Sequence, residues 1–218
     1  ILVINIKKMI NKFFKTIHNK YLRLFKFIFF LRYLFAIFLI SISLFLIIPT
    51  FFNYEKREQI IKNFLLEDYN LEIGEYKNIE YKAFPVPNLE LKKVQAKFVK
   101  SNTILNVNNL KIYPKIFSIY NFNYFEAKKI VFNESAADIK IVNLLIFIDQ
   151  LFSQKNKLSF NNLNLKILNE NKLVLHFKNT FFANFGYKKN FIKGKVFEKK
   201  FKAELGNNLE FIRFRVLN

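Results

Sequence analysis

The chain has 218 residues, no cysteine, and 36 Lys and Arg against 16 Asp and Glu, which gives a net charge of +20 at pH 7. The lack of cysteine excludes a disulfide framework, a thiolate metal site and a cysteine nucleophile. The positive charge suggests a nucleic-acid partner, but beyond residue 32 the cations are spread singly, without an Arg-rich block, an RNP-like motif or zinc-finger spacing. We therefore expect no nucleic-acid partner.

Residues 1–32 predict a basic amphipathic helix. The segment carries eight Lys and Arg and no acidic residue, and apolar residues recur in it at steps of three and four. Such a helix can lie on an anionic lipid leaflet. By the positive-inside rule this segment stays in the cytoplasm, which places residues 53–218 on the far side of the membrane.

Residues 33–52, YLFAIFLISISLFLIIPTFF, contain no charged side chain. A helix of this length rises about 30 Å, the thickness of a bilayer core. A buried helix of a soluble protein would keep a polar face over five turns, and a cleaved signal peptide would be followed by a pair of small residues at the cleavage site. Neither feature is present, so the segment predicts an uncleaved, single-pass transmembrane helix.

Residues 54–68 predict a short helix that Asn53 can cap, with an apolar stripe formed by Ile60, Ile61, Phe64 and Leu65. From Leu71 onward the apolar period changes to two, which is typical of half-buried strands. We expect strands at residues 71–81, 89–98, 105–112 and 124–132.

Three features interrupt this alternation. Proline cannot donate to a strand ladder, so the step Phe84-Pro85-Val86-Pro87 separates the first two strands. The parity of the apolar positions shifts at Lys92-Lys93, which suggests a β-bulge, and again at Asn108-Asn109. Residues 114–120 predict a helical turn.

Residues 139–152 predict a helix, with helical spacing at these positions: Val142, Leu145, Ile146, Asp149 and Phe152.

Beyond Ser153 the pattern predicts strand after strand, with a turn at residues 169–171. The expected strands are 158–160, 163–167, 173–177, 181–187, 191–197, 201–205 and 209–216. Short connections favour antiparallel neighbours, and alternation gives each strand one dry face. The expected fold is mainly β, with an N-terminal transmembrane helix, short helices, and curved antiparallel sheet that forms a groove. The last strand, residues 209–216, is expected to leave an open sheet edge.

Alternate apolar side chains on these strands project to one side of the sheet and are the candidate ligand-binding residues. They are Leu89, Leu91, Val94, Ala96, Phe98, Leu105, Val107, Leu163, Leu165, Ile167, Leu173, Leu175 and Phe177. Two interpretations of this face stay open: a trough for lipid acyl chains, and a core closed by the helix at 139–152. Because uncovered apolar surface costs about 25 cal/mol per Å², a trough predicts an apolar ligand.

Motifs for catalysis are absent from the sequence. His18 and His176 have no second histidine or acid at ligand spacing, and there is no G-x-S-x-G, phosphate-binding glycine loop or H-E-x-x-H. We therefore expect a protein that is not an enzyme, with no catalytic residue, no metal, no cofactor and no small-molecule substrate.

The segment Gly74–Val94, GEYKNIEYKAFPVPNLELKKV, resembles the N-terminal domain of the AsmA family. The family pattern has an inner-membrane helix, a short helix, a strand that ends in an aromatic-Pro-x-Pro step, and a strand of the form L-x-L-x-x-V. In this chain the step is Phe84, Pro85 and Pro87, and the strand is Leu89–Val94. The resemblance extends over roughly residues 33–216. Two features depart from it: Asn133-Glu134 stands where a proline commonly follows, and family members usually continue for several hundred residues more, which implies a truncated or fragmentary member.

The resemblance implies an inner-membrane protein with a periplasmic domain at 53–218 that carries phospholipid along a hydrophobic β-groove toward the outer membrane, or supports outer-membrane assembly. The implied partners are membrane lipids and other envelope proteins. A lipopolysaccharide-export anchor is an alternative, although the helix at 139–152 between two groups of strands favours the AsmA type. A second alternative is a membrane-tethered scaffold without lipid cargo, in which the apolar face is a closed core.

Overall fold

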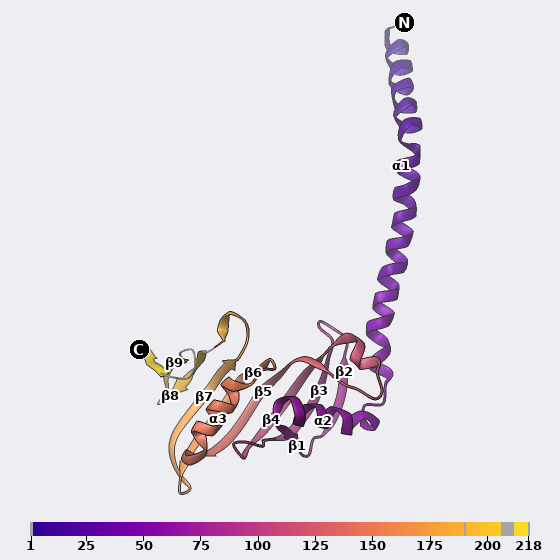
Figure 1. Cartoon of the computed structure of the whole chain (residues 1–218). Coiled ribbons are helices and arrows are strands. Elements are labelled where there is room, and N and C mark those ends of the chain that lie inside the picture. Colours follow the sequence, from indigo (N-terminus) through magenta and orange to yellow (C-terminus); the bar gives the residue numbers. More distant parts are fainter. Residues whose placement is uncertain (1, 190, 206–211, 218) are drawn as a thin grey trace. The chain divides into compact units, whose positions relative to one another are not determined.

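The computed structural model describes residues 2–189, 191–205 and 212–217. It divides into two units, Ile1–Ile48 and Pro49–Asn218 (Figure 1). The division falls close to the end of the predicted transmembrane segment, and each unit is described by itself.

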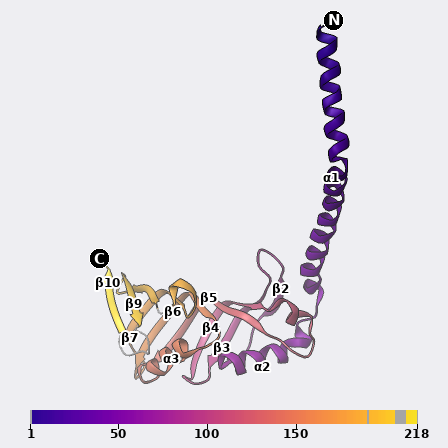
Figure 2. The ribbon, with the colours of Figure 1, turned by 45° about the horizontal axis from the view of Figure 1, so that its top comes forward.

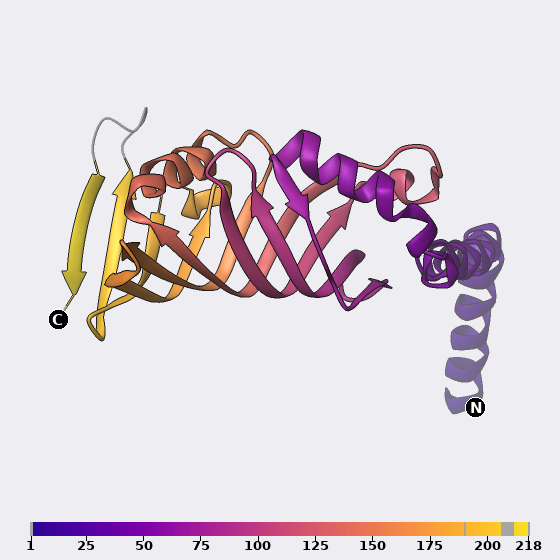
Figure 3. The ribbon, with the colours of Figure 1, turned by 90° about the horizontal axis from the view of Figure 1, so that it is seen from below.

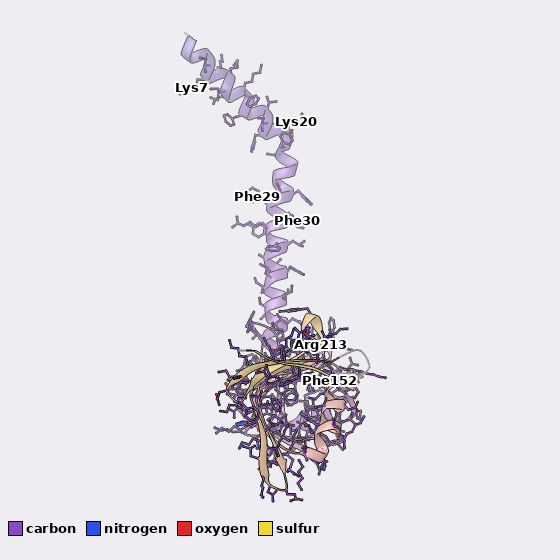
Figure 4. The ribbon with its side chains drawn as sticks, turned by 90° about the vertical axis from the view of Figure 1, so that its left-hand side faces the viewer. Lys7, Lys20, Phe29, Phe30, Phe152 and Arg213 are labelled. Atoms are coloured by element: carbon purple, nitrogen blue, oxygen red, sulfur yellow. The ribbon has the colours of Figure 1, made fainter. Side chains whose placement is uncertain are left out.

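The first unit is a single helix, α1 (Leu2–Ile47), in which the basic segment and the apolar segment are continuous. The expected boundary at residues 32 and 33 is therefore not a structural boundary. Residues Lys26–Phe51 are long and apolar enough to cross a membrane. No glycine or proline occurs before Pro49, which lies in the 3-10 turn, η1 (Ile48–Phe51), that follows the α-helix. Lys7, Lys20, Phe29 and Phe30 project outward from α1 in Figure 4.

The second unit is built on one open ten-stranded sheet (Figures 1 and 2). Its strands are β1 (Leu71–Ile73), β2 (Asn78–Lys82), β3 (Asn88–Phe98), β4 (Thr103–Pro114), β5 (Ala127–Lys140), β6 (Leu158–Asn169), β7 (Lys172–Ala183), β8 (Phe191–Val196), β9 (Lys199–Leu205) and β10 (Ile212–Leu217). The order is β1-β3-β4-β5-β6-β7-β8-β9-β10, and β2 also pairs with β3. The predicted mainly-β class is confirmed.

One pairing differs from the expected antiparallel sheet, because β5 and β6 are parallel. The chain leaves β5, passes through α3 (Ile141–Ser153), and re-enters the sheet in the same direction. A helix of this length supplies the crossover that parallel neighbours need. Figure 3 shows α3 and α2 (Glu58–Tyr69) on the same side of the curved sheet.

The predicted helical elements around the sheet are confirmed with small shifts. A 3-10 turn, η2 (Glu55–Arg57), leads into α2, and the Asn53 side-chain oxygen accepts a hydrogen bond from the Lys56 amide at 3.3 Å, as expected of a cap. The predicted turn at 114–120 is η3 (Ile116–Tyr120). A last short turn, η4 (Gly186–Lys188), follows β7.

The boundaries of several strands differ from the predictions. The strand expected at 71–81 is divided into β1 and β2, which both pair with β3. The backbone between them also bonds to β3, because the Gly74 amide donates to the Gln95 carbonyl at 2.9 Å. The strand expected at 124–132 begins and ends later, as β5. The segments expected at 173–177 and 181–187 form one strand, β7, which ends at Ala183, so residues 184–187 are not part of a strand. In the strand expected at 209–216, residues 209–211 lie outside the described part. Within the described residues, β10 pairs only with β9, which agrees with the predicted open edge of the sheet.

A row of irregular backbone crosses the middle of the sheet and explains the parity shifts. In β3 the buried positions change from Leu89 and Leu91 to Val94 and Ala96, and β4 changes in the same way beside Asn108. The β3–β4 register is the same before and after this point, so each strand has one residue here that is out of the alternation. The two residues face each other, and the pair is therefore not a β-bulge, in which two residues oppose one. The predicted parity shifts are confirmed, whereas the β-bulge suggested at Lys92-Lys93 was wrong.

The row continues through the neighbouring strands as residues with positive φ. These are Lys93 (51°) in β3, Glu134 (51°) in β5, Asn162 (64°) in β6 and Asn179 (50°) in β7. Asparagine tolerates this conformation better than most residues. Each strand thereby rotates about its axis, and its apolar side chains stay on the side that faces α2 and α3. Asn179 is part of this row rather than of a turn, which is why β7 is continuous.

Candidate apolar binding cavity

The helix α3 decides which part of the apolar face is covered. Its inward side chains are Leu144, Phe147, Ile148 and Leu151. Of the positions with helical spacing in the sequence, Phe152 packs against Phe182, whereas Val142 and Leu145 are both 73% exposed. The spacing predicted the helix, which is confirmed, but it did not predict the buried side, because α3 is apolar on both sides and periodicity alone cannot choose between them.

Two residues near the end of α3 set its rotation. The Gln150 side chain is buried and accepts a hydrogen bond from the Ser101 amide at 3.2 Å. Its amide nitrogen donates to the Asn70 carbonyl at 3.5 Å. Phe152 packs edge-on against Phe182, with ring centroids 4.9 Å apart. These contacts hold α3 across β5 and β6 with its Phe147 side inward.

A cavity of about 200 Å³ lies between α3 and strands β6 to β10. Its floor includes three aromatic rings from different strands. Phe177 of β7 lies edge-on to Phe201 of β9 at 5.1 Å, and Phe201 stacks with Phe214 of β10 at 5.3 Å. Phe214 is half exposed and stands on the last strand, so the cavity reaches the open edge of the sheet.

Thr180 supplies the only polar side chain among the described residues that line the cavity. It is 4% exposed, and its hydroxyl has no hydrogen-bond partner in the described part of the chain. A buried hydroxyl without a partner costs about 1–3 kcal/mol. The cavity can therefore hold an apolar chain, and it can offer one hydrogen bond to an acceptor on that chain. No charged side chain occurs among the described residues that line it.

The predicted binding residues separate into three groups. Leu163, Leu165, Ile167, Leu175 and Phe177 line the cavity. Leu89, Leu91, Val94, Ala96, Phe98, Leu105 and Val107 are buried in one closed core with α2. Leu173 is 57% exposed and lies outside both. The expected trough is therefore filled over β3 and β4.

The closed core is filled by α2 and by aromatic rings. Phe64 of α2 packs against Phe125 at 5.4 Å. Phe98 contacts Phe147 of α3 at 5.6 Å, and the neighbouring rings of Phe132 and Phe160 stack at 4.5 Å. With these rings in place, the inward apolar side chains of β3 and β4 are all buried.

Sequence reasoning missed two thirds of the described cavity wall. The missed residues are Leu144, Phe147, Ile148 and Leu151 of α3, Thr180, Phe182, Ile192, Phe201, Ala203 and Phe214. The strand alternation contained a signal for Phe201 and Ala203, which alternate with Lys200, Lys202 and Glu204, and for Ile192, which precedes Lys193. The α3 residues had no such signal, because the facing of that helix depends on Gln150.

The residues of the family motif lie outside the cavity. Phe84, Pro85 and Pro87 form the connection between β2 and β3, and the Phe84–Pro85 peptide bond is cis. Phe84 is exposed. The prolines end β2 and precede β3, as the sequence predicted. A comparison with models of protein families gives no match, and a comparison with curated proteins gives none either.

Proposed function

We propose that the protein is an envelope protein of AsmA type, anchored by α1 in the inner membrane, that binds phospholipid acyl chains in the cavity under α3. The observation that carries this proposal is the apolar cavity itself, bounded by α3 and β6–β10 and open toward the sheet edge. Acyl chains fit such walls because they need dispersion contacts and no hydrogen bonds. The resemblance at Gly74–Val94 adds the expectation of lipid transport toward the outer membrane, or of support for outer-membrane assembly.

The size of the cavity limits what it can hold. At about 200 Å³ it is smaller than the roughly 300–1,000 Å³ of sites for drug-sized ligands. It would hold a segment of one acyl chain, with the remainder of the lipid outside. The Thr180 hydroxyl is then placed to donate to the ester carbonyl at the head of that chain. Binding is passive, and no covalent bond is made or broken.

The orientation is proposed from the charges on α1. Eight Lys and Arg precede Tyr33, and no acid accompanies them. The positive-inside rule then places the N-terminus in the cytoplasm and the sheet in the periplasm. Alkaline phosphatase fused after Asn218 is expected to be active, and a green fluorescent protein fused at the same site is expected not to fluoresce. If the phosphatase fusion is inactive and the fluorescent fusion is bright, this orientation is wrong.

Lipid binding is tested by photo-crosslinking of the full chain in phospholipid nanodiscs. A photoreactive residue at Leu175 or Phe177, both half-buried in the cavity wall, is expected to crosslink to phospholipid. The same probe at Leu91 or Val107, in the closed core, and at His176, on the opposite side of β7, is the matched control. Crosslinks from His176 with none from Leu175 refute the cavity as the lipid site.

The substitution Thr180→Val gives the second arm of this experiment. Removing the unpartnered hydroxyl is expected to raise the free energy of unfolding of the ligand-free protein by about 1 kcal/mol. If the hydroxyl bonds to the ester carbonyl, the same change lowers the yield of crosslinks from Phe177 to phospholipid. A variant that is more stable and binds equally well would show that Thr180 does not contact the ligand.

The closed core over β3 and β4 supports a second candidate, a membrane-tethered scaffold without lipid cargo. Leu89, Ala96 and Leu105 have no exposed surface, as expected of a structural core. Absence of crosslinks from Leu175 and Phe177 would favour this scaffold function.

A further inference from the structure

The outer face of the last four strands carries an unusual arrangement of positive charge. The side chains of Ile192, Phe201 and Phe214 line the cavity, so the alternate positions on β8, β9 and β10 point to the opposite side of the sheet. Four directly opposed cross-strand pairs on that side join two cations. They are Lys178–Lys195, Lys195–Lys200, Lys193–Lys202 and Lys202–Arg215.

The rest of the sheet does not share this arrangement. Where a lysine in β3, β4 or β6 faces a charged residue on a neighbouring strand, that residue is acidic: Glu72 faces Lys97, Glu90 faces Lys111, and Asp138 faces Lys166. Among the described pairings of β1 to β6, no two cations are directly opposed. A lysine-rich composition would distribute such pairs over the whole sheet, so composition alone does not explain their concentration in β7–β10.

Like charges that face each other across two strands destabilise a sheet. Two acidic side chains among the described residues of this region offset them: Glu198 pairs with Lys178 at 2.5 Å, and Glu204 pairs with Lys202 at 2.7 Å. The hydrogen bond from Lys202 lowers the pKa of the Glu204 carboxyl, and the nearby charges of Arg215 and Arg213 lower it further. The field on this face is therefore strongly positive.

Two aromatic rings hold the lysines in place. The Lys193 amine lies 5.4 Å from the centre of the Phe181 ring, and the Lys202 amine lies 4.0 Å from that of Phe191. Such cation–π contacts keep the amines over the surface of the sheet rather than extended into water. Because the amines cover the rings, the rings are poorly placed to stack with nucleotide bases.

We propose that this basic face, formed by Lys178, Lys193, Lys195, Lys200, Lys202, Arg213 and Arg215, docks on an anionic lipid surface and binds the phosphates of its headgroups. Its cations form a two-dimensional array, about 4.8 Å apart between strands and about 7 Å apart along a strand. An array of this kind matches a planar field of phosphates better than the single track of a polynucleotide. The segment Lys26–Phe51, which can span a membrane, keeps a bilayer within reach. The proposal does not depend on the cavity, which lies on the other side of the sheet.

The test uses the full chain in nanodiscs of phosphatidylcholine, presented with vesicles of phosphatidylcholine alone or with added phosphatidylglycerol. We expect flotation with the anionic vesicles only, weakened by salt. The triple substitution Lys193→Gln, Lys195→Gln and Lys200→Gln is expected to lower the affinity about a hundredfold. Its midpoint of thermal unfolding is expected to stay the same or rise, because three of the opposed pairs lose a repulsion.

The matched control removes the same charge elsewhere, through Lys77→Gln, Lys100→Gln and Lys155→Gln, three exposed lysines outside β7–β10. It is expected to bind anionic vesicles with almost the affinity of the wild type. Equal losses in both triple variants would overturn the proposal, as would equal binding to neutral vesicles. A basic-face variant that loses binding to oligothymidine but keeps binding to vesicles would assign the face to nucleic acid. Crosslinking from Leu175 to phospholipid is expected to be unchanged, which separates this face from the cavity.

Discussion

Replacing Arg57 with Met will lower the free energy of unfolding of the β-sheet unit by about 3–5 kcal/mol. Arg57 ends η2 and is only 2% exposed. Its guanidinium donates to the carbonyl of Ile119 at 2.5 Å, to that of Ser118 at 3.3 Å, and to that of Asn121. These carbonyls lie in the last turn of η3 and at Asn121 directly after it, where backbone oxygens need donors from outside the helix.

The loss arises because methionine fills much of the same volume but donates no hydrogen bond. The Ser118 carbonyl keeps the Asn121 amide as a donor, but the Ile119 and Asn121 carbonyls lose the donor that Arg57 supplied. A buried polar group left without a partner costs about 1–3 kcal/mol. Burial lowers the pKa of the Arg57 guanidinium, while the nearby Tyr54 raises it. The guanidinium nevertheless remains charged at neutral pH, since arginine titrates far above that range. Its contribution is therefore expected to be constant between about pH 5 and 9.

Two further variants separate geometry from charge. Arg57→Lys keeps the charge but has no planar fork, and we expect an intermediate loss. Lys56→Met, at the exposed neighbour, is expected to change stability by less than about 0.5 kcal/mol. Unfolding is followed by circular dichroism in detergent, and hydrogen exchange of the Asn121 amide, which donates to Ser118 O at 3.2 Å, reports local opening. A stability of Arg57→Met equal to that of the wild type would contradict this role.

The strand pattern could be predicted because alternation depends on local sequence. Leu89, Leu91, Val94 and Ala96 are buried, and the shift of parity between them follows from Lys92-Lys93, two polar residues in succession. Alternation shows which side of a strand is apolar. It does not show what covers that side, and so the closure of β3 and β4 by α2 and α3 depended on tertiary packing.

The parallel pairing of β5 and β6 had a signal in the sequence that was not used. A helix was expected at 139–152 between two groups of strands, and a helical crossover joins parallel neighbours more readily than antiparallel ones. The sequence had no such signal for which side of that helix packs against the sheet. Ile141, Val142, Leu145 and Ile146 are as apolar as the residues that pack inward, and the contacts of Gln150 with Ser101 and Asn70 join segments distant in sequence.

Replacing Phe147 with Ala will destabilise the unit by about 3–5 kcal/mol, because it removes a buried ring and leaves a void next to the existing cavity. Phe147 is 2% exposed, lines the cavity and contacts Phe98. The matched control is Leu145→Ala on the same helix, where the side chain is mostly exposed and the expected change is below about 0.5 kcal/mol. Equal losses in the two variants would contradict the facing of α3.

The same variant links stability to the proposed ligand. The enlarged cavity of Phe147→Ala is expected to take up an acyl chain more readily, and a ligand that binds only the folded state stabilises it by about 2.7 kcal/mol at a hundredfold excess over its Kd. Added dodecanoic acid should therefore restore much of the lost stability of Phe147→Ala in nanodiscs. It should not restore Arg57→Met, whose defect lies in η3 and not in the cavity. Rescue of both variants, or of neither, would show that the acid does not act through the space between α3 and β6–β10.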